Sequence, residues 1–470
     1  MIQFILNDRE IKTSLSPGMT LLDFIRYQQH LTGTKIGCRE GDCGACTILT
    51  GELKKNKLVY SSATSCLMPL GNAKDKHIVT IEGINLDELN VMQQAFTEEG
   101  ATQCGFCTPG FIVSLAGFCI SENEPSYSGA IDSVNGNICR CTGYKSIERA
   151  AATINKKMQQ RNNNDPLQFA VENKMIPAYF LTIKERLQKM AVSPDVQTIN
   201  GVTAKKMGGG TDLYVQQHDT IVDENIDFLF DNLLFKGISK NGNTCEMGAA
   251  ATVTDIAESQ IFKDHFPHLD QYIKLVSSTQ IRNMATVAGN FINASPIGDL
   301  TILFLALNAK LKLSDGKINR DIQLKHLYKG YKLLDKTPEE IIEKISFELP
   351  GRNDLFNFEK VCKRTHLDIA SVNTAIHLRI ENELVTNAGL SAGGVGPIPA
   401  YLFKCSEFLI GKKISVQLIS ELASLAQTEI SPISDARGAE TYKRLLLSQL
   451  IKAHFIKLFP ELPLEQLIQS

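Results

Sequence analysis

The sequence predicts a multidomain α+β protein, and three observations lead to this fold class. The chain has 470 residues, which is enough for about three or four domains. Its hydrophobic spacing changes from a strand-like to a helical period near Leu86. A polar run, RNNNDP at 161–166, separates these two units from a mixed α/β remainder. We therefore expect units at 1–84 and 85–160, a linker at 161–175, and further units at 176–350 and 351–470.

The first unit is predicted to be β-rich. Ile2, Phe4 and Leu6 alternate as in a strand, and Leu21–Tyr27 forms a short amphipathic helix after Thr20. Further strands are predicted around Ile48, around Val59 and over 77–81.

The second unit is predicted to be helical. Leu89, Met92 and Phe96 share one helix face, and Thr108-Pro109 can start an apolar helix that runs to Cys119. Two more helices are predicted over 127–134 and 146–158. Beyond the linker, Leu349-Pro350-Gly351 suggests a boundary before a last unit with strands and one or two C-terminal helices.

The composition excludes several classes of protein. Hydrophobic residues make up 43% of the chain, which argues against disorder. The 49 Lys and Arg against 51 Asp and Glu argue against a dedicated binder of nucleic acid or anionic membrane. The N-terminus lacks a basic segment and a long apolar core, and 300–309 is too short to span a bilayer. We expect a cytoplasmic protein, with 300–309 as a buried helix.

The 12 cysteines are the main functional signal, because nine of them precede residue 150. In a reducing compartment such clustering indicates metal binding or catalysis more often than disulfides. Cys38-x4-Cys43-x2-Cys46, followed by Cys66, has the plant-ferredoxin spacing of a 2Fe-2S cluster. A zinc site, which favours two C-x2–4-C pairs, fits this spacing poorly. Glycines at positions 37, 41 and 44 allow positive φ and let N–H groups point at cluster sulfurs.

A second group consists of Cys104-x2-Cys107 and Cys139-x-Cys141. We expect both pairs at helix starts, where free N–H groups and the helix dipole stabilise thiolates. By spacing alone this group suits zinc and iron about equally. The other cysteines are interpreted as small packing residues: Cys119, Cys245, Cys362 and Cys405.

Three strings together resemble the molybdenum hydroxylases, the family of xanthine dehydrogenase and aldehyde oxidase: GCREGDCGACT (37–47), QCGFCTPG (103–110) and CRCTGY (139–144). The resemblance implies a 2Fe-2S cluster in a ferredoxin-like β-grasp domain and a second one in a four-helix domain. The expected metal ligands are therefore Cys38, Cys43, Cys46, Cys66, Cys104, Cys107, Cys139 and Cys141. It also implies that the second cluster is nearer to molybdenum and the first nearer to flavin.

Two glycine strings point to the flavin. No G-x-G-x-x-G follows a strand and no P-loop motif occurs, but Met207-Gly-Gly-Gly-Thr-Asp-Leu213 can form a nest of backbone donors. With 285–290 and 294–299 it resembles the FAD domain of the same family, of the vanillyl-alcohol-oxidase/PCMH type, followed by a C-terminal α+β domain. The resemblance places these residues at FAD: Met207, Gly208, Gly209, Gly210, Thr211, Asp212, Leu213, Thr286, Gly289, Asn290, Asp299 and Lys360.

Several of these residues, and the loop after Lys360, also have a purely structural interpretation. A glycine run is more often a turn, and Asp299 suits a helix N-cap. Lys360, Arg364 and Asp368 could form a solvated charged face. The resemblance instead puts the loop 364–368 near the isoalloxazine ring, where NAD would dock.

The resemblance implies the iron-sulfur and FAD subunit of a xanthine dehydrogenase, with no catalytic residue for the hydroxylation on this chain. Electrons would pass from a molybdenum-pterin large subunit through both clusters to FAD and NAD, in a dimer of heterodimers. Three alternatives remain open: an aldehyde or N-heterocycle substrate, a stand-alone iron-sulfur flavoprotein carrier, and a zinc-held interaction protein.

Overall fold

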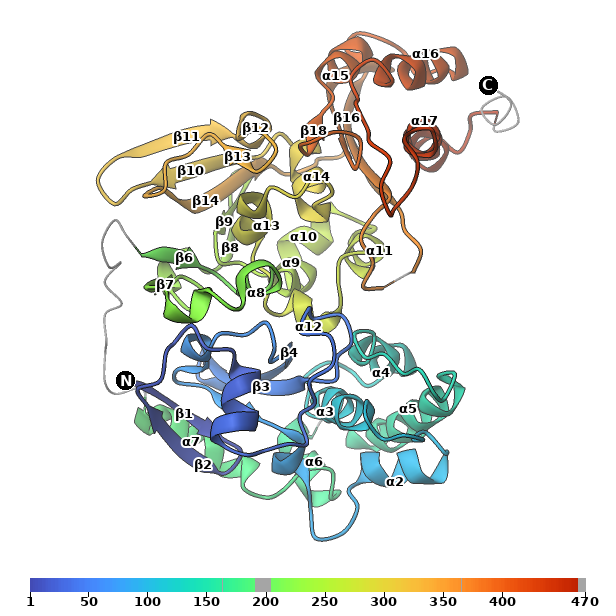
Figure 1. Ribbon diagram of the computed structural model, residues 1–470. Coiled ribbons are helices and arrows are strands. Elements are labelled where there is room, and N and C mark those ends of the chain that lie inside the picture. The colour runs from blue at the N-terminus through green and yellow to red at the C-terminus, as the bar shows by residue number, and fades with distance from the viewer. Residues whose placement is uncertain (163, 191–203, 365, 464–470) are drawn as a thin grey trace. The chain divides into compact units, whose positions relative to one another are not determined.

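The computed structural model describes residues 1–162, 164–190, 204–364 and 366–463, and the chain folds as two compact units (Figure 1). The first unit consists of Met1–Phe230 together with Ser278–Ala285. The second unit consists of Asp231–Ser277 together with Thr286–Ser470. The chain therefore leaves the second unit for one short segment and then returns to it. Each unit is described by itself below.

The first unit opens with a five-stranded mixed sheet in the order β2-β1-β5-β3-β4. Its strands are β1 (Ile2–Leu6), β2 (Arg9–Thr13), β3 (Thr47–Lys54), β4 (Lys57–Thr64) and β5 (His77–Val79). The central pair β1 and β5 is parallel, and the other pairs are antiparallel. The predicted helix after Thr20 is confirmed as α1 (Leu21–Asp23) and the π-helical η1 (Phe24–Gln28), and it packs its apolar side chains on the sheet.

Four helices follow, as predicted: α2 (Val91–Glu98), α3 (Thr108–Cys119), α4 (Tyr127–Ser133) and α5 (Lys145–Met158). Local signals fix their starts, because Asn90 forms a capping box with Gln93 and Pro109 stands in the first turn of α3. Met92 and Phe96 are buried on one face of α2, whereas Leu89 precedes the helix and is exposed.

The expected linker at 161–175 differs from the structure, because it contains the helix α6 (Pro166–Glu172). Asp165 caps this helix, and Phe169 and Met175 are buried in the same core as α2 to α5. A further helix, α7 (Phe180–Met190), packs against the first sheet. The polar letters at 161–166 mark a turn and a helix cap, and the apolar residues that follow them form part of the core. The other predicted boundaries stay predictions.

The rest of the first unit is small. A parallel pair, β6 (Lys205–Met207) and β7 (Ile226–Phe228), surrounds α8 (Leu213–Gln217), and the returning segment forms α12 (Thr279–Arg282). Tyr214 is buried, and its hydroxyl donates to the Gly18 carbonyl at 2.7 Å. Four short 3-10 helices complete the described part of this unit: η2 (Leu70–Ala73), η3 (Ile81–Ile84), η4 (Gln159–Arg161) and η5 (Ile221–Asp223).

The second unit contains an antiparallel sheet in the order β11-β10-β14-β9-β8. Its strands are β8 (Ile238–Asn241), β9 (Thr244–Gly248), β10 (Lys310–Ser314), β11 (Asn319–Gln323) and β14 (Ile341–Glu348). The associated helices are α9 (Val253–Glu258), α10 (Gln260–His265), α11 (Leu269–Lys274), α13 (Val287–Asn293) and α14 (Asp299–Ala306). The short elements are η6 (Leu233–Phe235), η7 (Leu324–His326), β12 (Tyr328–Gly330) and β13 (Leu333–Leu334). The prediction of a buried helix over 300–309 is confirmed for 300–306, all of which are buried, whereas α14 ends before residues 307–309.

A second, four-stranded antiparallel sheet completes this unit, with the strands in chain order. Its elements are β15 (Asp354–Val361), β16 (Val372–Glu381), β17 (Leu384–Gly393), β18 (Ala400–Tyr401), α15 (Phe403–Leu409), α16 (Val416–Ala426) and α17 (Glu440–Leu458). Neighbouring residues of β16 point to opposite faces, since Asn373 contacts Asp299 of α14 and Thr374 contacts His454 of α17. Up to residue 463, three helices follow the last strand, where one or two were predicted.

No helix within the described ranges is both long enough and apolar enough to cross a lipid bilayer.

Candidate iron-sulfur and flavin sites

The first cysteine group comes together in the first unit as two pairs of thiols. Cys38 and Cys43 lie on the loop before β3 and share a hydrogen bond between their thiols. Cys46, just before β3, and Cys66, just after β4, form the second pair. The Cys38 thiolate also interacts electrostatically with Cys46 and Cys66. The hairpin of β3 and β4 therefore closes the distance between residues 46 and 66.

Backbone N–H groups point at these sulfurs. The Glu40 N–H donates to Cys38 Sγ at 3.3 Å, and the Cys38 N–H donates to Cys43 Sγ at 3.4 Å. The hydrogen bond from the Cys43 thiol, followed by the backbone N–H groups of Glu40, Cys43 and Asp42, outweighs burial and lowers the pKa of Cys38 to about 5. The same pairing with Cys38, together with burial, raises the pKa of Cys43, so the loop favours one thiolate of the pair. The backbone donors to both sulfurs suit the negative charge of an iron-sulfur cluster.

The loop glycines have two different roles. Gly41 and Gly44 have φ of 78° and 66°, as predicted. Gly37 does not have positive φ, so the prediction is wrong for it; a Cβ there would lie only 2.6 Å from Cys43 Sγ. Its role is to make room for a sulfur.

Arg39, which no sequence motif singles out, lies in the same loop with φ of 60°. Its guanidinium donates to both carboxylate oxygens of Asp23, at 2.6 and 3.0 Å. The hydrogen bonds from Arg39 and Thr20 hold the pKa of Asp23 below its ordinary value, although burial opposes them. This pair fixes the cysteine loop to the end of α1.

The second cysteine group also comes together in the first unit. Cys104 Sγ lies 3.6 Å from Cys141 Sγ, and the thiols of Cys107 and Cys139 are hydrogen-bonded. Cys107 is the N-cap of α3, as predicted. The prediction of a helix start is wrong for Cys104, Cys139 and Cys141, because α3 begins at Thr108 and α5 only at Lys145.

The turn after Cys139 supplies the donors that a helix end was expected to supply. The Thr142 hydroxyl and N–H lie 3.1 and 3.4 Å from Cys139 Sγ, and the Cys141 N–H lies 3.4 Å away. Burial raises the pKa of Cys139, but these hydrogen bonds outweigh it and hold the pKa below its ordinary value. Cys104 and Cys141 are exposed, whereas Cys46 and Cys66 are buried.

The pairing of thiols bears on the choice between iron and zinc. In the described part of the chain, no three or more His, Cys, Asp or Glu side chains are arranged to hold a metal ion. A 2Fe-2S cluster shares four thiolates between two irons, two on each. Both cysteine groups have this two-by-two arrangement, so the residues fit 2Fe-2S clusters.

The segments that carry the two groups are in direct contact. The Ile138 N–H, next to Cys139, donates to the Cys43 carbonyl at 3.0 Å. A Cβ at Gly110 of α3 would lie 2.3 Å from the Gly44 carbonyl oxygen. The backbone at Gly44, in the first cysteine group, therefore leaves room only for glycine at position 110, next to the second cysteine group.

The remaining cysteines are separate from these groups. Cys119, Cys245 and Cys405 are fully buried among apolar residues, and Cys362 is partly exposed. Burial raises the pKa of Cys119 and of Cys245 to about 12. These thiols are protonated and unreactive at neutral pH, which agrees with a packing role.

The first glycine string lies in the first unit, between β6 and α8. A Cβ at Gly209 would lie 1.8 Å from the Met284 carbonyl oxygen, and Gly210 has φ of 86°. The Gly208 carbonyl accepts from Asn72 at 3.2 Å. Glycine is required here for a close backbone approach as well as for the turn.

The second glycine string lies in the second unit. Thr286 is the N-cap of α13, and its hydroxyl accepts from the Gly289 N–H at 3.1 Å. The Asn290 side-chain oxygen accepts from the N–H and hydroxyl of Thr301, at 3.1 and 2.9 Å. These bonds fix the start of α13 relative to α14 within one unit.

Asp299 and Lys360 form a buried ion pair at 2.7 Å in the second unit. The Lys360 side chain is 1% exposed and also donates to the Leu275 carbonyl at 2.7 Å. The other oxygen of Asp299 accepts from Asn373 at 2.6 Å. The interpretation of Lys360 as part of a solvated face is therefore wrong, and Asp299 is the first residue of α14 after the N-cap Gly298.

The loop after Lys360 is more open. The Arg364 side chain is 51% exposed and lies 3.9 Å from Asp368, whose carboxylate also accepts from the Arg364 N–H at 2.8 Å. The predicted flavin residues thus lie partly in each unit: 207–213 in the first, and the others in the second.

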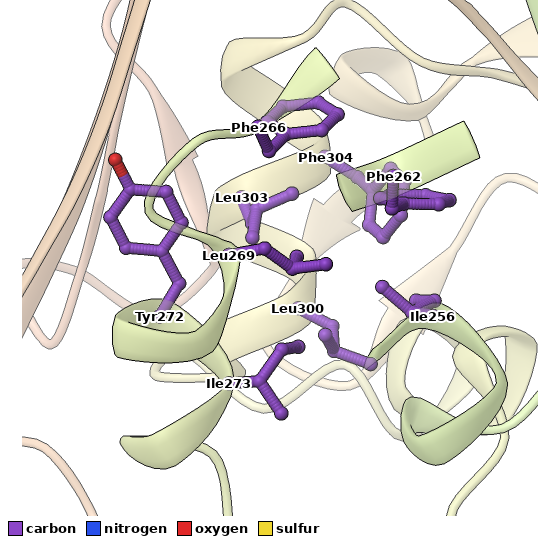
Figure 2. A pocket seen from close by; sticks show the side chains of 9 residues that line it. All are labelled: Ile256, Phe262, Phe266, Leu269, Tyr272, Ile273, Leu300, Leu303 and Phe304. Atoms are coloured by element: carbon purple, nitrogen blue, oxygen red, sulfur yellow. The ribbon is translucent and has the colours of Figure 1, made fainter. Parts of the chain in front are cut away.

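Figure 2 shows an apolar cavity in the second unit. Its volume is about 10 Å³, and its lining comes from α9, α10, α11 and α14. The Tyr272 hydroxyl is directed away from it and donates to the Phe356 carbonyl at 3.1 Å. A cavity this small, with no polar group directed into it, is a packing defect rather than a cofactor site.

Four family models match consecutive parts of the chain. They are described as a "2Fe-2S iron-sulfur cluster binding domain" (4–70), a "[2Fe-2S] binding domain" (80–152), an "FAD binding domain in molybdopterin dehydrogenase" (187–350) and a "CO dehydrogenase flavoprotein C-terminal domain" (358–458). Their order is the order in which the sequence predicts the two clusters and the flavin.

The curated relatives of the chain are longer proteins. It is 27% identical to the xanthine dehydrogenase of Emericella nidulans over 95% of this chain and 38% of that protein. It is 26% identical to the xanthine dehydrogenase/oxidase of Rattus norvegicus over 96% of this chain and 38% of that protein. The chain therefore spans about 38% of the length of these relatives.

Solved structures show the same fold over about half of the chain. A carbon monoxide dehydrogenase from Hydrogenophaga pseudoflava has a TM-score of 0.51 and 23% identity, covering 54% of this chain and 88% of that chain. A quinoline 2-oxidoreductase from Pseudomonas putida has a TM-score of 0.50 and 20% identity, covering 55% and 90%. With two 2Fe-2S domains, an FAD-binding domain and the flavoprotein C-terminal domain, the chain belongs to the molybdenum hydroxylases.

Proposed function

We propose that the chain is the electron-transfer subunit of a xanthine dehydrogenase. Its own part is to hold two 2Fe-2S clusters and FAD between a molybdenum-pterin centre on a large partner subunit and NAD. The observation that carries the proposal is the presence of two groups of four thiols, each paired two by two and supplied with N–H donors.

The proposed cluster ligands are those predicted from the sequence. Cys38, Cys43, Cys46 and Cys66 hold the first cluster, and Cys104, Cys107, Cys139 and Cys141 hold the second. When bound, the clusters carry electrons one at a time, and the flavin collects two and releases them as a pair. Because Cys104 and Cys141 are exposed, we assign the second cluster to the side that receives electrons from the partner.

The proposed flavin residues come from both glycine strings and from the buried ion pair. They are Met207, Gly208, Gly209, Gly210, Thr211, Asp212, Leu213, Thr286, Gly289, Asn290, Asp299 and Lys360. A run of glycines can form a nest of backbone N–H donors for phosphate, and Thr286 caps the start of α13, a position that favours an anion. Asp299 and Lys360 supply a fixed pair of opposite charges. NAD is assigned to the loop at 364–368, in which the Arg364 side chain is exposed.

Xanthine or hypoxanthine is the proposed substrate of the complete enzyme, and its support is the likeness to xanthine dehydrogenases over more than nine-tenths of this chain. Substrate choice belongs to the partner, so an aldehyde or another N-heterocycle is the alternative. The solved structures named for carbon monoxide and quinoline show how one flavoprotein fold serves several substrates. We place the complex in the cytoplasm as a dimer of heterodimers.

The test is purification with the natural partner, followed by assays of NAD reduction on xanthine, hypoxanthine and simple aldehydes. NAD reduction with the two purines supports the proposal. If only an aldehyde is turned over, the proposed substrate would be an aldehyde instead of a purine. A partner without molybdenum, or no partner at all, would leave a stand-alone electron carrier.

A further inference from the structure

A buried cluster of polar side chains lies between the two cysteine-bearing segments. We call it the Asn137 cluster; it consists of Thr47, Ser114, Asn137 and Gln280 with the Gly44 carbonyl. All four side chains are at most 5% exposed. They come from four separate parts of the chain: the start of β3, α3, the segment before Cys139, and α12.

Asn137 is the centre of this cluster. Its side-chain N–H groups donate to the Gly44 carbonyl at 3.0 Å and to the Thr47 hydroxyl at 3.2 Å. Its side-chain oxygen accepts from Ser114 at 2.8 Å and from Gln280 at 3.0 Å. Gly44 lies between the ligand positions 43 and 46, and Asn137 lies two residues before Cys139. One side chain therefore connects the two cysteine loops.

Gln280 connects this cluster to the returning segment Ser278–Ala285. Its amide also donates to the Ser114 hydroxyl at 3.1 Å. A Cβ at Gly136 would lie 2.0 Å from the Gln280 side-chain oxygen, and a Cβ at Gly44 would lie 2.3 Å from the Gly136 carbonyl. Because Gly44 and Gly136 have no side chain, the segments around Gly44, Gly136 and Gln280 lie close enough for the side-chain amides of Asn137 and Gln280 to form their hydrogen bonds.

We propose that Asn137 is a positioning residue that holds the two cysteine loops at a fixed separation for electron transfer between their clusters, and that Gln280 holds Asn137 in place. This inference rests on the proposed function, because it requires both clusters. The ends of the loops already share the bond from the Ile138 N–H to the Cys43 carbonyl. Asn137 adds side-chain bonds on the other side of the same contact.

The physical reason is the environment of these groups. A hydrogen bond between buried groups is strong, and a network of such bonds has one favoured arrangement. Electron transfer needs a fixed distance between centres, and hydrogen bonds near cluster ligands also tune the reduction potential. A hydrophobic contact of the same size would permit the loops to shift relative to each other.

The test uses the full-length protein with its clusters and FAD, reduced with dithionite and observed by electron paramagnetic resonance at low temperature. Two reduced clusters on adjoining loops split or broaden each other's signals. The variants are Asn137→Leu and Gln280→Met, which keep about the same volume and remove the hydrogen bonds. Asn135→Ala is the matched control, because Asn135 binds Thr279 of the same segment and does not reach Gly44.

We expect Asn137→Leu to lose most of the splitting while iron and flavin contents stay at the wild-type level. Gln280→Met should lose part of it, the double variant should resemble Asn137→Leu, and Asn135→Ala should not change. If Asn137→Leu does not fold, Ser114→Ala removes one bond of the cluster and should weaken the splitting as Gln280→Met does.

Three results would overturn the inference. They are full splitting in a folded Asn137→Leu protein, equal loss in Asn135→Ala, and the absence of any interaction between two reduced clusters in the unaltered protein. An unaltered protein that contains no iron would instead refute the proposed function.

Discussion

The thiols of Cys38 and Cys43 show how single residues define this protein. Their spacing identifies them in the sequence, and a local loop supplies their hydrogen bonds, so both were predictable. Arg39 was not, because its ion pair with Asp23 depends on where α1 ends relative to the loop. Asn137 and Gln280 were not either, because they are 143 residues apart and meet only in the folded first unit.

The ligand assignment predicts a selective loss. Cys43→Ser should remove the first cluster and leave the second cluster and FAD in place, because each cysteine group has its own thiols and donors. Iron analysis, visible absorption and flavin release measure this. Cys362→Ser is the matched control and should keep both clusters, since Cys362 lies outside both groups. Loss of both clusters and the flavin in Cys43→Ser would contradict the assignment.

His77 predicts a dependence of stability on pH. It is fully buried, with Tyr60 at 2.7 Å and the Asn7 carbonyl at 2.9 Å, and burial lowers its pKa to about 3. Since an unfolded histidine titrates near 6.5, only the unfolded chain takes up this proton between about pH 6.5 and 3. The contribution of His77 to the free energy of unfolding is therefore fully present above pH 6.5 and is lost progressively as the pH falls below this value.

The expected cost at pH 5 relative to pH 7 is about 2 kcal/mol. Urea unfolding at both pH values, compared between wild type and His77→Gln, measures it, because the variant should lack this part of the pH dependence. His30→Gln, at an exposed position of the same unit, should retain it. Equal pH dependence in His77→Gln and wild type would disprove the account.

At the scale of elements, local signals predicted most of the helices and strands of the first 160 residues. Thr20 and Pro109 mark helix starts by local hydrogen bonding or by a fixed φ, which a sequence displays directly. The helix α6 was missed because its polar first turn dominates the pattern, whereas Phe169 is buried only through contacts with distant helices. Burial of this kind depends on the folded structure and is not visible in the local sequence.

Gly110 of α3 gives a test of packing between elements. Gly110→Ala should destabilise the first unit by about 1–3 kcal/mol, because its Cβ would meet the Gly44 carbonyl at 2.3 Å. Gly129→Ala in α4 is the control, since its nearest neighbour is the Ser126 hydroxyl at 3.1 Å. It should be neutral or slightly stabilising, as alanine is favoured in helices. Urea unfolding compares the two, and equal effects would refute the close contact.

The ion pair of Asp299 and Lys360 joins α14 to β15. Lys360→Met should destabilise the second unit by about 3–5 kcal/mol, because it leaves the Asp299 carboxylate buried without its cation. The double variant Lys360→Met/Asp299→Leu should recover much of this loss, since no charge then remains buried. Denaturant unfolding measures both proteins. A double variant no more stable than Lys360→Met would show that the charges are solvated.

At the scale of the whole molecule, the order of domains carries the functional argument. Two cysteine groups precede two glycine strings, and the family models match in the same order. The segment Ser278–Ala285 belongs to the first unit although it lies in the middle of the sequence of the second. The sequence did not predict this return, because nothing local marks residues 278–285 as part of another core.

The central claim is that this chain carries two 2Fe-2S clusters and FAD. Metal and flavin analysis of the purified protein, together with its visible absorption spectrum, tests this claim most directly. We predict about four iron atoms per chain, two for each cluster, with flavin absorption and without zinc. A colourless protein that contains zinc and no flavin would contradict the account.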